Sequence, residues 1–247
     1  MTLDGRFELG KAIAENELVL HYQPIVTVTE RKLVAVEALV RWRHPTRGIL
    51  PPSQFVPAIE RAGLARELTL WVLREAILQA AVWKNDGEPL SVGVNLSPEN
   101  LRDAQFRRFL DITVRAVGGP ELLVAELPAA ALTSPEQVES LSLVRNKGIR
   151  IAIDDVTAPI ELANVPADAI KLGRALVSRL PTDERALKEA NEVVQAAKLL
   201  GRTVTAVGIE DELTWRRVVA LGCDLGQGYA VSEPLSTADL ETWRPRR

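Results

Sequence analysis

The sequence predicts an α/β fold, a (β/α)₈ barrel with an antiparallel early strand, and two observations lead to it. Eight short β-branched segments alternate with longer amphipathic ones over nearly all of the 247 residues, which is the rhythm of such a barrel. Between the first two segments, Val26 to Lys32 is too short for a crossover helix, so these strands should run antiparallel. A doubly wound open sheet is the competing architecture.

The predicted strands are short apolar runs bounded by glycine, proline or polar residues. They are Leu18 to Tyr22, Leu33 to Trp42, Leu90 to Leu96, Leu122 to Leu127, Arg150 to Asp154, Ala169 to Leu172, Thr203 to Val207 and Cys223 to Ala230.

Helix boundaries between these strands carry their own signals. Ser97-Pro98 and Ser134-Pro135 each place a serine at the N-cap and a proline at the first helical position. Gln137 completes a capping box with Ser134. Glycines stand where helices should end, at Gly63, Gly87, Gly118, Gly148, Gly201 and Gly222.

No low-complexity linker divides the chain, so we expect a single domain over residues 1–247. Residues 1–16 are expected to form an N-terminal helix. The segment from Thr182 to Leu200 has apolar and alanine positions that suit a helix packed on a sheet. The ending at residues 244–247 is interpreted as a short, solvated basic tail.

Composition excludes several classes of function. A net charge of -3, without a block of Lys and Arg, argues against a nucleic-acid polymer as partner. Cys223 is the only cysteine, so there is neither a disulfide framework nor a thiolate zinc site. No secretory leader is visible, and no run approaches the ~20 apolar residues of a membrane helix. We therefore expect a soluble cytoplasmic protein without a membrane partner.

Polar residues mark the predicted strand ends, where a barrel of this class places its chemistry. They are Gln23, Glu37, Arg41, Asn95, Glu126, Asp154, Asp155, Lys171 and Gln227. Each has a structural explanation by itself: Asn95 could cap the helix that Pro98 opens, and Lys171 could be an ordinary ion-pair partner. The presence of so many polar residues at one end of the predicted barrel favours a shared functional site.

Glu37 and Arg41 illustrate the ambiguity best. They lie in one apolar segment, on the same face of a strand, where a charge without a partner is costly to bury. A structural ion pair inside the sheet would give this pattern. So would a metal-binding carboxylate beside a cation that holds a phosphate.

The residue types also fit together chemically. Four of these residues carry hard oxygen donors, which suit Mg²⁺ or Mn²⁺ rather than zinc: Glu37, Asn95, Glu126 and Asp154. Asp155 could reach a second ion, and such pairs clamp both oxygens of an in-line phosphoryl displacement. Lys171 could neutralise the attacked phosphate or hold a nucleophilic water. With only two histidines and no glycine-rich phosphate loop, histidine-based chemistry and nucleoside triphosphate cofactors are disfavoured.

Taken in this order, the motifs resemble the EAL-domain family of cyclic di-GMP phosphodiesterases over essentially the whole chain. The matching segments are Tyr22-Gln23-Pro24, Glu37-Ala38-Leu39-Val40-Arg41-Trp42, Phe55-Val56-Pro57 with Glu60, Asn95-Leu96-Ser97, Asp154-Asp155, Lys171, Gly222-Cys223-Asp224 and Gln227-Gly228-Tyr229. The resemblance implies a modified TIM barrel with an antiparallel early strand.

The resemblance also implies roles for individual residues. Metal ligands would be Glu37, Asn95, Glu126, Asp154 and, for a second ion, Asp155. Lys171 would help to activate water, as part of a catalytic group with Glu37 and Asp155. Contacts to the nucleotide would come from Gln23, Arg41, Asn95 and Gln227.

Departures from the family pattern concern the same site. The family's Glu-x-Thr-Glu reads Glu126-Leu127-Pro128-Ala129, and its Ala-Glu-Gly-Val-Glu reads Ala206-Val207-Gly208-Ile209-Glu210. Ala129 therefore replaces a carboxylate that steadies the loop after the fifth strand, and Val207 replaces the one closest to the attacking water. That loop, from Val156 to Glu161, has lost its glycines and is shorter, and Leu172-Gly173 replaces Ile-Asp.

These departures predict a degenerate EAL domain, hydrolytically inactive or very weak, that binds cyclic di-GMP as a receptor or acts as a protein-interaction module. Glu210 could replace the missing carboxylate, but its position favours a helix cap. One alternative is a slow Mg²⁺- or Mn²⁺-dependent phosphodiesterase that produces pGpG. The other is a module that binds another signalling protein without nucleotide.

Overall fold

The computed structural model describes residues 3–15, 17–117, 119–132, 134–158 and 165–244. Its strands are β1 (Leu18–Thr27), β2 (Leu33–His44), β3 (Gly48–Leu50), β4 (Ser91–Asn95), β5 (Leu123–Pro128), β6 (Arg150–Val156), β7 (Ala169–Leu172), β8 (Thr203–Val207) and β9 (Leu225–Gln227).

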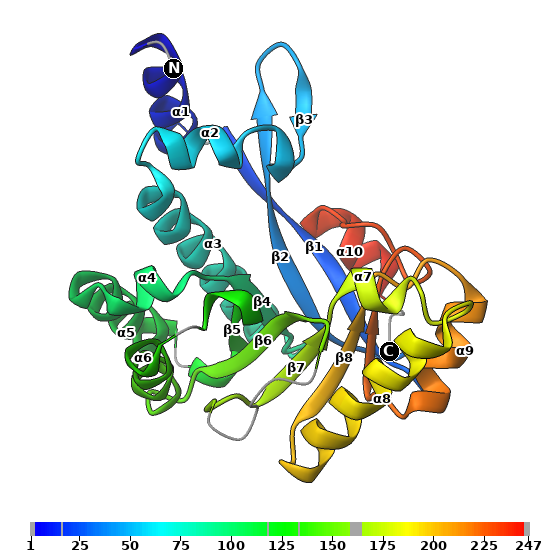
Figure 1. Ribbon diagram of the computed structural model, residues 1–247. Helices are drawn as coiled ribbons and strands as arrows, with labels where there is room; N and C mark the ends of the chain where they lie inside the picture. Colours follow the sequence, from blue (N-terminus) through cyan, green and yellow to red (C-terminus); the bar gives the residue numbers. More distant parts are fainter. Residues whose placement is uncertain (1–2, 16, 118, 133, 159–164, 245–247) are drawn as a thin grey trace.

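Eight of these strands close into a ring, because β1 pairs with both β2 and β9. β1 runs antiparallel to both neighbours, whereas the pairs from β2–β4 round to β8–β9 are parallel. β3 lies outside the ring and extends β2 as a hairpin (Figure 1). The barrel with an antiparallel early strand is thus confirmed, and the open doubly wound sheet is wrong.

Helices surround the ring on its outside. They are α1 (Leu3–Ala14), α2 (Val56–Arg61), α3 (Ala65–Asn85), α4 (Pro98–Arg102), α5 (Ala104–Val117), α6 (Pro135–Arg145), α7 (Arg174–Val177), α8 (Glu184–Leu199), α9 (Glu212–Leu221) and α10 (Thr237–Trp243). Three short 3₁₀ turns complete the described structure: η1 (Pro52–Gln54), η2 (Pro120–Leu122) and η3 (Ala129–Ala131).

The predicted caps are present within the described residues, and the predicted helix end at Gly118 lies outside them. The hydroxyl oxygens of Ser97 and Ser134 accept hydrogen bonds from the backbone N–H of Asn100 and Gln137, so both serines are N-caps with complete capping boxes. Asn95 is therefore not the cap of α4. Gly222 ends α9 in the left-handed conformation with φ 79°, which a residue without Cβ adopts at little cost.

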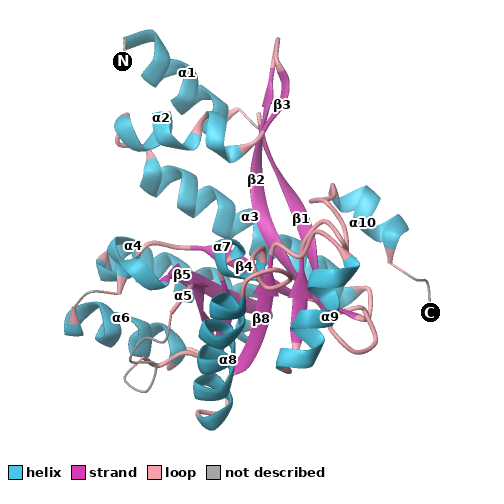
Figure 2. Cartoon of the chain, turned by 45° about the vertical axis from the view of Figure 1, so that its right-hand side comes forward, coloured by secondary structure: helices cyan, strands magenta, loops and turns pink. Residues whose placement is uncertain are grey.

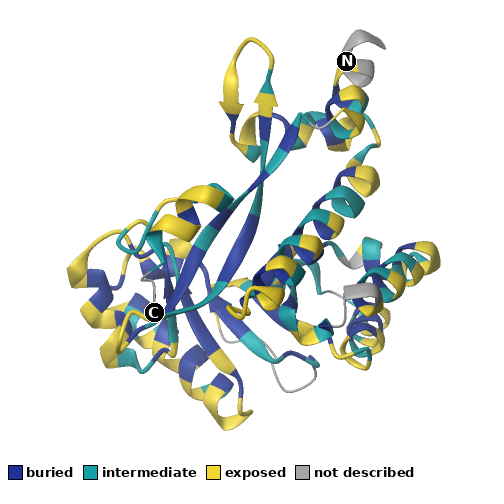
Figure 3. Ribbon diagram, turned by 180° about the vertical axis from the view of Figure 1, so that it is seen from behind, coloured by how far each residue is buried: buried dark blue, intermediate teal, exposed yellow. Residues whose placement is uncertain are grey.

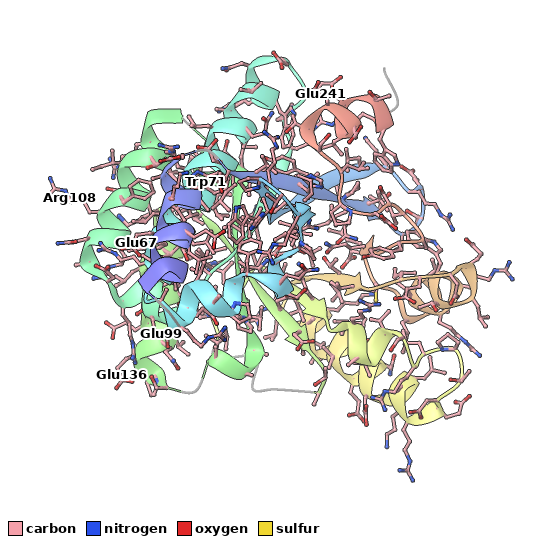
Figure 4. All side chains as sticks on the ribbon, turned by 90° about the horizontal axis from the view of Figure 1, so that it is seen from above. Glu67, Trp71, Glu99, Arg108, Glu136 and Glu241 are labelled. Atoms are coloured by element: carbon pink, nitrogen blue, oxygen red, sulfur yellow. The ribbon has the colours of Figure 1, made fainter. Side chains whose placement is uncertain are left out.

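The core lies inside the ring and between the ring and the helices. Figure 3 shows buried residues along the strands and the inward helix faces, and exposed residues on the outward faces. The helix predicted from Thr182 to Leu200 is α8, which lies along β8 and buries Ala190, Val193 and Val194 (Figure 2). On the opposite side of the barrel, Arg108 and Glu136 point outward (Figure 4).

Strand lengths differ from the predictions for local reasons. β1 continues past Tyr22 to Thr27, and Pro24 is tolerated within it because β9 pairs with β1 only at Val26 and Thr27. β9 is shorter than predicted, since Gly228 turns the chain at φ 154°. The hairpin strand β3 carries too short an apolar signal to be predicted.

The predicted basic tail is wrong for Arg244. Its side chain is 9% exposed, lies over the ring of Trp83 at 4.8 Å, and donates to Glu88 at 3.2 Å. The guanidinium thus packs on an aromatic face and pairs with a carboxylate instead of being solvated. Residues 245–247 lie outside the described residues. Within the described ranges, no helix combines the length and apolar character needed to cross a bilayer.

Candidate functional site

Glu37, on β2, is the centre of a connected set of polar side chains at the carboxyl ends of the strands. Its Oε1 accepts from Asn95 Nδ2 at 2.8 Å. Its Oε2 accepts from Lys171 Nζ at 2.9 Å and from Gln227 Nε2 at 2.8 Å. Three predicted site residues from β4, β7 and β9 therefore meet on one carboxylate.

Lys171 joins the remaining carboxylates to this centre. Its ammonium lies 2.6 Å from Glu126 Oε2 and 4.0 Å from Asp154 Oδ1. The side chain is 3% exposed. We call the set formed by Glu37, Glu126, Asp154 and Lys171 the Lys171 cluster. The structure thus brings together most of the residues that the sequence predicted for the rim.

Gly93 makes this packing possible, and the sequence reasoning missed it. The parallel β2–β4 pairing places Gly93 opposite Glu37. A Cβ on Gly93 would lie 2.1 Å from Glu126 Oε1, so only glycine leaves room for that carboxylate. A glycine inside an otherwise apolar strand is a known signal of close approach, and it was the available clue.

The electrostatics of the Lys171 cluster are dominated by burial and mutual attraction. Burial would lower the pKa of Lys171, but the carboxylates of Glu126 and Glu37 outweigh it and raise that pKa well above its usual range. Burial would raise the pKa of Glu37, but Lys171 and the hydrogen bonds from Gln227 and Asn95 bring it below its usual range. These two groups therefore form a buried ion pair.

Glu126 and Asp154 behave differently. Burial, with the nearby charge of Glu37, raises the pKa of Glu126 to about 8 despite its contact with Lys171. Burial also raises the pKa of Asp154. One ammonium does not balance three carboxylates, so the cluster favours a retained proton or an additional cation.

The oxygen donors fit a divalent ion of the Mg²⁺ or Mn²⁺ type. Asn95 donates to Glu37 through its amide nitrogen, so this hydrogen bond leaves its amide oxygen free to accept or to bind a cation. Within the described part of the chain, no three acidic, histidine or cysteine side chains form a ready-made metal site. Because Lys171 holds Glu37 and Glu126, a cation would take over part of the contacts that the ammonium now makes.

Two cavities flank the carboxyl end of β2 and share Leu39 and Pro52. The larger, of about 840 Å³, extends under α2, α3 and α4 and has Asn95 and Asp154 at its edge. The smaller, of about 250 Å³, is lined by Gln23, Leu39, Arg41, Pro52, Arg174, Val207, Gly208, Glu210, Gly228, Tyr229 and Pro234. The larger cavity alone has the size of a small-molecule site.

Arg41 faces the smaller cavity and is not an ion-pair partner of Glu37. Its Nη1 donates to the carbonyl oxygen of Val40 at 2.9 Å, while Glu37 is bonded to Lys171. The structural ion pair considered from the sequence is therefore made by Glu37 with Lys171 and not with Arg41. Gln23 lines the same cavity and accepts from Gln227 Nε2 at 3.0 Å, and Gln227 Oε1 finds no donor in the described residues.

Position 207 contributes no charge to this cavity. Glu210 lines it as well, but forms an ion pair with Arg174 and is exposed. The prediction that Glu210 caps the next helix is wrong. Asp211 is the N-cap of α9, and its Oδ1 accepts from the backbone N–H of Thr214 at 2.7 Å, because the shorter side chain reaches the first turn.

Asp155 stands apart from the Lys171 cluster. It follows Asp154 at an irregularity between β6 and β7, is exposed, and has φ 53°. Its backbone N–H donates to Asp154 Oδ1 at 2.8 Å. Ala129, at the altered position after β5, begins η3 and is half-buried. Of the shortened segment after Asp155, Pro159 to Glu161 lie outside the described residues.

Comparison with known proteins identifies the class. The amino-acid sequence matches the family model described as the EAL domain over residues 7–234. The chain belongs to the EAL domain family.

Relatives of the chain include named enzymes. It is 33% identical over 249 residues to the cyclic di-GMP phosphodiesterase PA2567 of Pseudomonas aeruginosa, covering 96% of this chain and 42% of that protein. It is 34% identical over 243 residues to an uncharacterized signaling protein of Caulobacter vibrioides, covering 96% and 30%. The chain therefore spans less than half of these relatives.

A solved structure shares the fold closely. The PaMucR phosphodiesterase in its c-di-GMP complex superposes with a TM-score of 0.90 at 28% identity, covering 96% of this chain and 100% of the other.

Proposed function

We propose that the chain is a degenerate EAL domain that binds cyclic di-GMP at the barrel rim and hydrolyses it very slowly or not at all. The observation that carries the proposal is the lining of the smaller cavity: Gln23 and Arg41 remain, while β8 presents Val207. A cation and amides can hold a nucleotide phosphate and base, whereas valine cannot accept a proton. Relatives named as cyclic di-GMP phosphodiesterases support the choice of ligand.

Different residues of the smaller cavity would contact different parts of the nucleotide. Arg41 would hold a phosphate, since its guanidinium lines the cavity without a carboxylate partner in the described residues. Tyr229 is 59% exposed beside it and offers an aromatic face for a base. Gln23 and Gln227 are fixed relative to each other by their mutual hydrogen bond, which would reduce the ordering cost on binding.

Glu37, Asn95, Glu126 and Asp154 would hold Mg²⁺ or Mn²⁺, with Asp155 serving a second ion. Such an ion would polarise the phosphate and lower the pKa of a water. Lys171 would orient Glu37 and Glu126 through the bonds at 2.9 and 2.6 Å. The carboxylate nearest the attacking water would be missing at Val207, and the exposed Glu210 is already paired with Arg174.

Titration calorimetry tests the binding part of this proposal. Wild-type protein with Mn²⁺ should bind cyclic di-GMP, and Arg41→Ala should weaken binding about tenfold or more, the cost of a charge-assisted hydrogen bond. Arg108→Ala, an exposed arginine on the far side of the barrel, is the matched control and should bind like wild type. Absence of heat with wild type at high micromolar ligand would exclude the receptor.

One observation favours a second function, a slow phosphodiesterase. The Lys171 cluster is intact, so the groups that would position metal and phosphate are present even without a carboxylate at position 207. Slow formation of pGpG that disappears in Glu37→Ala would establish this activity.

A further inference from the structure

The position of Gly173 excludes a larger residue because a neighbouring side chain fills the space, and not because its backbone conformation requires glycine. It has φ -64° and ψ 146°, an ordinary extended conformation that any residue adopts. Yet a Cβ at this position would lie 2.2 Å from Asp155 Oδ1 and 3.1 Å from Thr157 Cγ2. The carboxylate of Asp155 thus occupies the space that a side chain at position 173 would fill, which we call the Gly173 space.

Backbone contacts hold both residues in place, so the side chain of Asp155 has to yield most. The backbone carbon of Asp155, 3.3 Å from the added Cβ, would have to move by only a few tenths of an ångström. The N–H of Gly173 donates to the carbonyl oxygen of Val156 at 3.0 Å. The N–H of Asp155 donates to Asp154 Oδ1, and its φ of 53° is unusual for a residue with a Cβ. A side chain at 173 would therefore force the Asp155 carboxylate into another rotamer.

In the Gly173 space, Asp155 is not part of the Lys171 cluster. Lys171 pairs with Glu37, Glu126 and Asp154, and within the described residues it makes no ion pair with Asp155. Gly173 is also the N-cap of α7 and supplies no side-chain cap. The carboxylate of Asp155 lies where that capping side chain would have been.

We propose that Gly173 is a positioning residue that keeps Asp155 out of the second cation position by giving its carboxylate an alternative place. The inference rests on the proposed function in taking the rim as a cation site and Asp155 as a ligand of the second ion. If the Asp155 side chain divides its time between two rotamers and only one of them can bind the cation, the apparent affinity for that cation is reduced by the fraction of the time spent in the binding rotamer. Filling the Gly173 space removes the competitor, and the charge of a cation at Asp154 then attracts the displaced carboxylate.

Binding of Mn²⁺, followed through the spectroscopic signal of the free ion without nucleotide, tests the proposal. Gly173→Ala should bind the second Mn²⁺ about tenfold more tightly than wild type. In an Asp155→Ala background the same substitution should change nothing. Gly10→Ala, whose Cβ would meet nothing within 4 Å, controls for the general effect of replacing a glycine. An unchanged or weaker second affinity, or an equal gain without Asp155, would overturn the inference.

A crystal structure of wild type with and without Mn²⁺ gives a second test that does not depend on a variant folding. The Asp155 carboxylate should fill the Gly173 space without Mn²⁺ and leave it when Mn²⁺ is bound. A carboxylate that stays there in both states would overturn the proposal. If wild type binds one Mn²⁺ and Gly173→Ala does not bind a second Mn²⁺ more tightly than wild type, the inference fails but the proposed cation site stands. If no Mn²⁺ binds to either protein, both fail.

Discussion

The two parts of the barrel rim differ in how firmly their charged side chains are held. In the Lys171 cluster, Glu37 alone accepts three hydrogen bonds, and Lys171 and Glu126 are almost fully buried. At the margin, Asp155, Arg174 and Glu210 are exposed, and Arg174 and Glu210 form an ion pair with each other. Several contacts hold each charged side chain of the Lys171 cluster in place, whereas the charged side chains at the margin are held by fewer contacts.

If hydrolysis is lost as proposed, this difference explains why the signature Glu37-Ala38-Leu39 persists. Removing one partner from a buried ion pair leaves an uncompensated charge, which is strongly destabilising. We therefore expect the Lys171 cluster to be needed for folding as well as for the proposed ligand binding. Val207 and Gly173 lie outside the Lys171 cluster, so we expect substitutions there to leave its ion pairs intact.

The largest effect is expected for Lys171→Met. It leaves Glu37 and Glu126 buried without their cation and should lower the free energy of unfolding by about 3 kcal/mol or more. Arg174→Met at the margin, where the arginine side chain is 66% exposed, should change it by no more than about 0.5 kcal/mol. Urea denaturation measures both. Equal losses would show that the two parts of the rim are held alike.

Gly93→Ala should have the next largest effect. The added Cβ would meet Glu126 Oε1 at 2.1 Å, so overpacking should cost about 1–3 kcal/mol of unfolding free energy. Gly10→Ala, with open space around its Cβ, should show no loss in the same denaturation experiment. A tolerated Gly93→Ala would mean that Glu126 can leave the Lys171 cluster cheaply.

Much of this arrangement could be predicted from the sequence, because it follows from strand periodicity. Polar residues such as Asn95 and Lys171 end apolar strands, and a closed parallel ring brings such ends to one rim. The short link after β1 fixed the antiparallel strand in the same way. Both inferences use only neighbours along the chain and the rules of strand connection.

Contacts between residues distant in sequence could not be predicted. Nothing near Arg244 indicates that it packs on Trp83, and nothing near Gly173 indicates that Asp155 fills its space. Likewise, Asp211 and Glu210 are adjacent carboxylates, and only the geometry of the turn decides which one caps α9. Such details depend on rotamers that the packing of the whole fold selects.

A gain of function at the margin would sharpen the comparison. Val207→Glu should raise hydrolysis of cyclic di-GMP about tenfold, because it returns a proton acceptor to the cavity, while the missing support at Ala129 limits the gain. Val207→Gln has the same shape without the charge and should stay at the wild-type rate. Chromatography of the nucleotide measures both. Equal rates would show that the segment after Asp155 is the larger defect.

A further prediction concerns the dependence of stability on pH. Folding raises the pKa of Glu126 from 4.5 to about 8, so between these values the folded chain keeps a proton that the unfolded chain has lost. The free energy of unfolding should therefore fall as pH rises through this window, by at most about 1.4 kcal/mol per pH unit. Denaturation with chelator present should show this slope in wild type and a flatter one in Glu126→Gln. Identical slopes would contradict the raised pKa.

The central claim is that the rim binds cyclic di-GMP better than it cuts it. A single-turnover experiment tests this most directly, with protein in excess over cyclic di-GMP, Mn²⁺ present, and bound and free nucleotide separated before chromatography. The account predicts that the nucleotide is bound by wild type, is bound more weakly by Arg41→Ala, and remains cyclic. Rapid conversion of the bound nucleotide to pGpG, lost in Glu37→Ala, would contradict it.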